Sequence, residues 1–366
     1  MPSPIEDVIL AAGGKYLIFK FNEPKPQLGI FDVEQSDWVK TLNMTTQHFK
    51  MAANQDKLII GLQETGELQR YNLETFEQEI TRQYTGFKIQ TMALGWDSND
   101  APMLVLLTPK ERHSKLLFSE QFVFIDVNSM LMSKMEVNGW KSLKNTSEKK
   151  GIGGNHKFLL RASANGKIFT GWEKDAKHSY IIQLENNSVY YSLDTEAGDL
   201  VPNYDGTMIY TQNKGIVDAH FNSKVTGFGK GNLIPSLKGE VGFKVNYGYK
   251  DEGNYRLTMV DSVNIYRIKG YQYQQLTTLD DFSEMKYLQK RVKKRISIPQ
   301  RGYDPFGRFL ENFPPNYYDS IMITNYGNPD QLTDKQRFWL FPDLNRLITI
   351  PYSNDRLVIR EVNLEP

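Results

Sequence analysis

Short apolar runs recur along the chain, and a small turn rich in Ala, Asn, Asp and Gly separates the runs of each pair. In the first copy, residues 8–21 precede residues 28–42, and Gly13-Gly14 stands where the first two strands must reverse. Glycine tolerates the positive φ angles that tight reversals need. The second copy, residues 48–62 followed by residues 67–80, has nearly the same spacing. The pattern predicts a repeat of short strands.

Five further copies follow the same order of strand, turn and strand. They cover residues 89–137, 157–193, 199–221, 233–279 and 337–364. The turns of the fourth and fifth copies hold Asn165-Gly166 and Asp205-Gly206, which are typical of two-residue hairpin loops. The sixth copy is less regular, and the last copy supplies only three strands.

Strands that repeat with this period predict an all-β fold, a β-propeller of seven blades, with six or eight blades as the alternatives. We expect residues 1–366 to form a single propeller domain. The last copy then needs a fourth strand from elsewhere. Residues 4–8 are the candidates, because propellers commonly pair strands from both chain ends in one blade, which removes an exposed edge.

Residues 280–336 break the period and read as an insertion between blades six and seven. Acidic residues from Asp280 precede Met285, Leu288 and Val292 at helical spacing, and basic residues follow, as the helix dipole prefers. This pattern predicts a short helix that ends near Arg295. Several prolines come after it and predict irregular chain, or a two-strand excursion around residues 320–324. The insertion is therefore expected to be mixed helical and irregular.

The segments AAGGKYLIF and LGIFDVE near the start, and LITIPYSNDRLVIREVNL at the end, resemble the WD-repeat-like (YVTN-type) propellers of large bacterial multidomain proteins. The resemblance covers most of the chain through the repeat pattern. The Gly-His signature of the eukaryotic WD repeat is absent, so the match is to the general class. The resemblance implies an interaction or sensing module that forms one domain of a larger protein.

Composition narrows the function classes. Aromatic residues make up 12% of the chain, which suits half-buried strand surfaces. The net charge of +1 provides no whole-molecule field toward nucleic acid or an anionic membrane. The chain has no cysteine, which excludes thiol nucleophiles, disulfides and cysteine-bound metals and leaves the compartment open. The sequence shows no signal-peptide pattern and no long apolar run, so we expect a soluble chain, with export as part of a larger parent left open. We also expect a monomer.

Metal ligation has only weak support. The five histidines, His48, His113, His156, His178 and His220, show no ligand spacing, although His48 and His156 precede equivalent first strands. Residues 96–100 place Asp97, Asn99 and Asp100 in a turn with alternate oxygen ligands, faintly like a calcium loop. The glycine and distant Glu of an EF-hand are missing, so a polar turn is the preferred interpretation. We expect no metal and no cofactor.

The most concentrated charge in the chain is a basic run with aromatic residues near it. The candidate partner-binding residues are Lys290, Arg291, Lys293, Lys294, Arg295, Tyr303 and Phe306. Such clusters can bind phosphates, anionic lipid or a protein partner, while a solvated surface explains the same run without any partner. The glycine-rich residues 227–231 lack the strand and helix context of a nucleotide-binding loop, and we expect a flexible connection there.

These observations favour a non-catalytic propeller that binds a protein partner or senses a ligand through its rim loops and its insertion. A small-molecule ligand stays open, and nucleic acid is disfavoured. The alternative is a propeller enzyme of the lactonase, lyase or quinone-dependent dehydrogenase type, with its site on the central axis.

Overall fold

A computed structural model describes most of the chain. The described residues are 4–110, 121–133, 136–137, 158–173, 178–185, 188–225, 232–252, 255–269, 272–298, 302–303, 309–310, 316–325 and 332–364. Their regular structure is almost entirely β-strand, with three short 3-10 turns, η1 (Ala12–Gly14), η2 (Asp334–Gln336) and η3 (Pro342–Leu344).

The first four blades are antiparallel sheets of strands that follow one another in sequence. They comprise β1 (Ile5–Ala11), β2 (Tyr16–Phe21), β3 (Gln27–Asp32) and β4 (Asp37–Asn43); β5 (Phe49–Ala53), β6 (Lys57–Leu62), β7 (Glu67–Asn72) and β8 (Gln78–Gln83); β9 (Phe87–Ala93), β10 (Met103–Pro109), β11 (Gln121–Asp126) and β12 (Leu131–Met132); and β14 (Phe158–Ala162), β15 (Ile168–Glu173), β16 (His178–Glu185) and β17 (Ser188–Asp194). A short strand, β13 (Glu136–Val137), adds to β17 in parallel.

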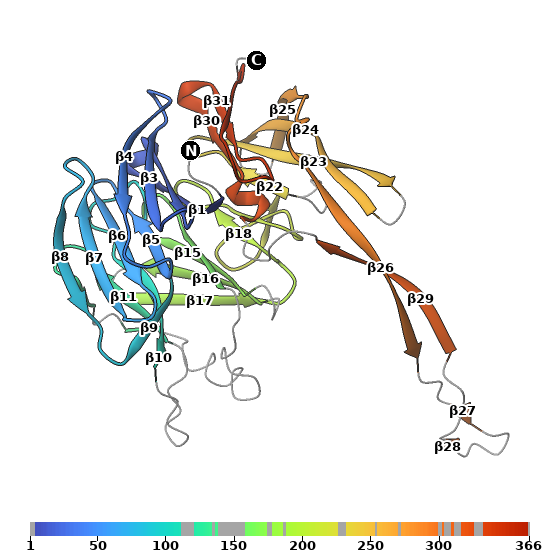
Figure 1. The fold of residues 1–366 in the computed structure, drawn as a ribbon, viewed down its shortest axis with the longest axis horizontal. Helices are drawn as coiled ribbons and strands as arrows, with labels where there is room; N and C mark the ends of the chain where they lie inside the picture. The colour runs from blue at the N-terminus through green and yellow to red at the C-terminus, as the bar shows by residue number, and fades with distance from the viewer. Residues whose placement is uncertain are drawn as a thin grey trace.

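Three more blades complete the ring. They comprise β18 (Leu200–Pro202), β19 (Ile209–Thr211), β20 (Ile216–Val217) and β21 (Ser223–Val225); β22 (Asn232–Pro235), β23 (Val241–Glu252), β24 (Tyr255–Lys269) and β25 (Gln272–Leu279); and β30 (Phe338–Phe341), β31 (Arg346–Thr349) and β32 (Val358–Glu361). The first strand of every blade lines one central cavity, so the sheets are arranged radially around an axis (Figure 1). The prediction of a seven-bladed, all-β propeller is confirmed.

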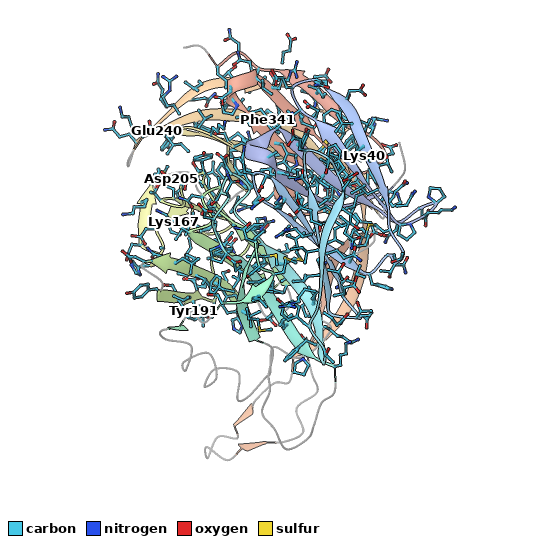
Figure 2. The ribbon with its side chains drawn as sticks, turned by 90° about the vertical axis from the view of Figure 1, so that its left-hand side faces the viewer. Lys40, Lys167, Tyr191, Asp205, Glu240 and Phe341 are labelled. Carbon is cyan, nitrogen blue, oxygen red and sulfur yellow. The ribbon has the colours of Figure 1, made fainter. Side chains whose placement is uncertain are left out.

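The predicted turns lie where the strands reverse. Gly13, Gly166 and Gly206 have φ angles of 64°, 67° and 78°, the left-handed region that favours glycine. These turns form the rim of the propeller, and the exposed residues Lys167, Asp205 and Glu240, from blades four, five and six, follow one another along one edge of the molecule (Figure 2).

The core is divided among the interfaces between blades. Blades one and two share a buried cluster that includes Ile18, Leu28, Phe49 and Leu58, and equivalent clusters lie between the other pairs of neighbouring blades. Blade seven packs on blade one in the same way, through Phe341 and other apolar residues. Each blade therefore buries both of its faces only when both neighbours are present.

The ring closes without a shared strand in the described chain. Residues 5–8 belong to β1, the innermost strand of the first blade, so their predicted place in the last blade is wrong. Closure instead uses the packed interface and hydrogen bonds that cross it. The Ile5 amide donates to the Asn354 carbonyl at 2.9 Å, and the Arg346 guanidinium donates to the carbonyl oxygens of Val33 and Glu34 at 2.8 and 2.9 Å.

The insertion forms a strand where a helix was predicted. β26 (Lys286–Ile298) pairs with β24 at its start and then with β29 (Asn316–Asn325). The helical spacing of Met285, Leu288 and Val292 is thus overridden by pairing with distant strands, whereas the predicted two-strand excursion around residues 320–324 is confirmed. Figure 1 shows β26 and β29 leaving blade six as a two-stranded arm, with β27 (Gly302–Tyr303) and β28 (Phe309–Leu310) beyond it.

Candidate functional site

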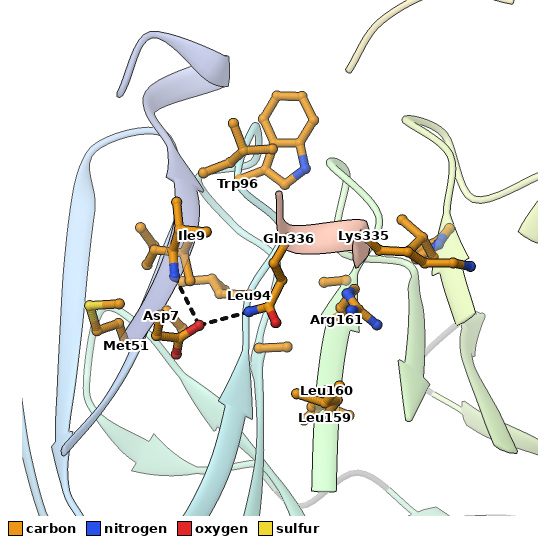
Figure 3. Close-up of a pocket in the computed structure, with 18 of the residues that line it drawn as sticks. Asp7, Ile9, Met51, Leu94, Trp96, Leu159, Leu160, Arg161, Lys335 and Gln336 are labelled. Carbon is orange, nitrogen blue, oxygen red and sulfur yellow. Dashed lines mark hydrogen bonds between the residues drawn. The ribbon is translucent and has the colours of Figure 1, made fainter. Parts of the chain in front are cut away.

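The central axis holds a cavity of about 180 Å³. Most of its lining is apolar. It includes Ile9, Met51 and Leu160, from the first strands of blades one, two and four, and Leu94, which directly follows β9 (Figure 3). Within the described chain, the charged residues of the lining are Asp7, Lys50, Arg161 and Lys335. An apolar, concave site with a few polar groups is the usual form of a small-molecule pocket.

The short η2 turn reaches the cavity and joins blades that are distant in sequence. Thr333 and Gln336 form a capping box, in which Gln336 Oε1 accepts from the Thr333 amide at 3.1 Å. Gln336 Nε2 donates to Asp7 Oδ1 on β1 at 2.9 Å (Figure 3), and Asp334 Oδ1 accepts from the Tyr352 hydroxyl at 2.9 Å. The turn is therefore fixed to blades one and seven.

Lys335 is the most deeply buried cation of the cavity wall, with 5% of its surface exposed. Its Nζ donates to the carbonyl oxygens of Asp199 and Tyr210 at 3.0 and 2.9 Å. The pKa of Lys335 is lowered to about 7, chiefly by burial; the Asp199 carboxylate opposes this shift, and the nearby Arg161 charge contributes to it.

Arg161 on β14 lies beside Lys335 and pairs with the Asp199 carboxylate through both guanidinium ends. It also donates to the Leu200 carbonyl at 3.0 Å and to Thr333 Oγ1 at 3.2 Å. Arg161, Lys335 and Asp199 thus form a cluster of two cations and one carboxylate that links blades four and five to η2. We call it the axial charge cluster.

An aromatic contact lies near the turn end of the first strands. The Trp96 and Tyr204 rings meet edge to face with centroids 5.5 Å apart, and the Tyr204 hydroxyl donates to the Asp97 carboxylate. This hydrogen bond raises the pKa of Tyr204 to about 12. Asp97 is therefore engaged across the ring, between blades three and five, within a turn.

The other weak metal candidates are not gathered with Asp97 into a ligand set. His48, Asn99 and Asp100 are exposed, and the described residues contain no group of three or more His, Cys, Asp or Glu side chains that could hold a metal ion. His113, His156 and the glycine-rich residues 227–231 lie outside the described residues.

The predicted partner-binding residues lie on the arm. Lys290, Arg291, Lys293, Lys294 and Arg295 are all in β26, and their register partners on β29 are Thr324, Ile323, Ile321, Ser320 and Asp319. Tyr303 belongs to β27, and Phe306 lies outside the described residues. The structure thus brings the basic run onto one strand of a ribbon, opposite a single acidic register partner.

Sequence reasoning did not identify the axial charge cluster. Arg161 reads as one polar position in a strand, and Lys335 reads as part of a polar loop. The one local signal is the spacing of Thr333 and Gln336, which fits a capping box and marks a short helical turn.

No protein-family model and no curated protein sequence matches the chain. Among solved structures, the chain is similar to the β-propeller domain of Cps50 (Swd1) from Myceliophteria thermophila, with 12% identity over 79% of this chain and 89% of that chain and a TM-score of 0.46. It is also similar to the WD40 repeats of RRP9, with 7% identity over 76% and 81% of the two chains and a TM-score of 0.46. A third similar structure is the complex of KlAtg21 with the coiled coil of AgAtg16, with 10% identity over 73% and 82% and a TM-score of 0.42.

None of the helices in the described residues is long and apolar enough to cross a membrane. The described strands form a seven-bladed β-propeller.

Proposed function

We propose that this chain is a protein-interaction propeller of the WD-repeat-like type, one domain that spans residues 1–366, whose arm binds an acidic surface on a partner protein. The observation that carries the proposal is the arm itself, a ribbon of ten register pairs that leaves blade six (Figure 1). A projecting ribbon whose backbone is already paired offers side chains to a partner while the blades hold its base in place.

The charge of the arm supports an acidic partner. The paired segments 289–298 and 316–325 contain five basic residues and one acidic residue, Asp319, while the whole chain has a net charge of only +1. The positive charge is therefore concentrated locally, and complementary charge speeds association and selects partners. Tyr303 and Phe306 follow the basic run in the sequence, and aromatic residues are a type enriched at interfaces.

A charge-reversal variant tests the arm. The change Lys290→Glu, Lys293→Glu and Lys294→Glu keeps the strand length, and a matched control reverses the exposed Lys25, Lys40 and Lys167 on the propeller surface. Cross-linking and mass spectrometry of complexes isolated from the native cell should identify partners through arm lysines. These partners should be lost in the arm variant, retained in the control and weakened by salt. Partners that bind both variants equally would contradict the proposal, and a nuclease-sensitive association would indicate nucleic acid instead.

The axial cavity supports a second candidate function, that of a propeller enzyme. The cavity is concave and has buried charged groups in its wall, as an active site often has. Such an enzyme would retain a metal or a chromophore in the purified protein. Elemental analysis and an absorption spectrum of the full chain would detect either one.

A further inference from the structure

The axial charge cluster carries more positive than negative charge. Arg161 and Lys335 face one carboxylate, that of Asp199, which Arg161 already engages at both ends. The two hydrogen bonds of Lys335 to described residues go to neutral carbonyl oxygens. Buried charges in proteins are normally paired, because an unpaired ion loses its hydration without compensation. Among the described residues, the cluster therefore has one more positive than negative charge whenever Lys335 is protonated, and an anion in the cavity would balance that charge.

The remaining charged groups around the cavity fix where an anion can lie. Asp7 is held by Gln336 on the far side of the cavity from Arg161 and Lys335 (Figure 3) and would repel an anion there. Asp334, on the same turn as Lys335, accepts a hydrogen bond from the Tyr352 hydroxyl of blade seven. Lys50 adds a further positive charge to the lining. The favourable end of the cavity is thus the one beside Arg161, whose side chain keeps 18% of its surface exposed.

The rest of the lining sets the size and polarity of the ligand. A cavity of about 180 Å³ is slightly larger than the engineered cavity of about 150 Å³ that holds benzene in another protein. Ile9, Met51, Leu94 and Leu160 surround this space with apolar atoms. A small inorganic ion would leave that surface uncovered, whereas a compact apolar group would cover it.

We propose that the axial cavity binds a small organic carboxylate, whose anionic group contacts Arg161 and Lys335 and whose apolar body lies against Ile9, Met51 and Leu94. The bound carboxylate balances the charge of protonated Lys335, and the site is separate from the arm. It needs no chemical step, and it holds whether or not the arm binds a partner.

Binding of benzoate to the full chain tests the proposal, with benzyl alcohol, benzylamine and inorganic phosphate as comparison ligands in calorimetry and thermal unfolding. Benzoate should bind at least tenfold more tightly than each of the other three, a difference of about 1.4 kcal/mol or more. Equal binding of benzyl alcohol would show an apolar cavity without anion selectivity. Equal binding of phosphate would show an anion site without an apolar pocket. Either result, or the absence of benzoate binding at millimolar concentration, would overturn the proposal.

Two variants locate the site. Lys335→Met removes the cation and keeps the length of the side chain, and it should weaken benzoate binding at least tenfold. Lys167→Met, at an exposed rim position (Figure 2), should bind benzoate as the unmodified chain does. If Lys335→Met does not fold, Lys335→Gln retains a donor for the Asp199 carbonyl and serves in its place. Unchanged affinity in a folded Lys335 variant would refute the assignment.

Discussion

Lys335 makes the stability of the propeller depend on pH in a predictable direction. Burial lowers its folded-state pKa to about 7, from an ordinary value of 10.5. Between these two values the unfolded chain binds one proton more than the folded chain, so the free energy of unfolding rises with pH. The slope for one proton is about 1.4 kcal/mol per pH unit. Below pH 7 both states are protonated, and the full cost of burying the charge remains.

The perturbation is Lys335→Met, which removes the titrating group but retains an apolar chain of similar length. Other groups titrate too, so the useful quantity is the unfolding free energy of the unmodified chain minus that of the variant. From pH 7.5 to pH 9.5 this difference should rise by roughly 2–3 kcal/mol in favour of the unmodified chain. The variant also leaves the carbonyl oxygens of Asp199 and Tyr210 without their Lys335 donor, a cost that does not change with pH, so the prediction is the rise of the difference with pH and not its sign at one pH.

Urea unfolding monitored by tryptophan fluorescence at pH 6.5, 7.5, 8.5 and 9.5 measures this difference. The same series on Lys167→Met provides the control, and its difference from the unmodified chain should stay flat because Lys167 is exposed. A flat series for Lys335→Met as well would mean that Lys335 keeps its charge in the folded protein. The reasoning from burial would then be refuted.

Three further substitutions test other contacts. Gly95→Ala should destabilise the chain by about 1–3 kcal/mol in chemical unfolding, because an added Cβ would lie 2.4 Å from the Gly166 nitrogen of the next blade. Gly86→Ala would add a Cβ with nothing within 4 Å of it, so this variant measures only the backbone cost of a positive φ. Asp97→Asn should lower the pKa of Tyr204 from about 12 toward its ordinary value in an ultraviolet titration, because the carboxylate that raises it is gone; an unchanged titration would contradict the hydrogen bond. Arg337→Met should cost about 1–3 kcal/mol, because Arg337 donates to the Pro351 carbonyl at 2.8 Å and to Asn354 Oδ1 at 2.7 Å; no loss of stability would mean that these acceptors find other donors.

The blades could be predicted from the sequence because the strands of each blade lie close together along the chain. Alternating apolar positions and turn residues such as Asn165-Gly166 are read within about 40 residues. The prediction failed for residues 285–295, because Met285, Leu288 and Val292 fit a helix locally and pairing with β24 and β29 decides otherwise.

The axial site could not be predicted for a related reason. Arg161 and Lys335 are 174 residues apart in the numbering and meet only because the first strands converge on the axis. A lone lysine after an aspartate, as in Asp334-Lys335, gives no sign that it will be buried. The basic run of β26 was visible because a charge cluster is itself a local pattern.

The packed interface between blades seven and one closes the ring. The blades of every other neighbouring pair follow one another along the chain, whereas contacts such as Gln336 to Asp7 join residues separated by 329 positions. Closing so long a loop has a high entropic cost and delays folding. We therefore expect the interface between blades seven and one to form last during folding and its amide hydrogens to exchange first. The partly unfolded state that costs the least free energy would then be an elongated, open spiral of blades.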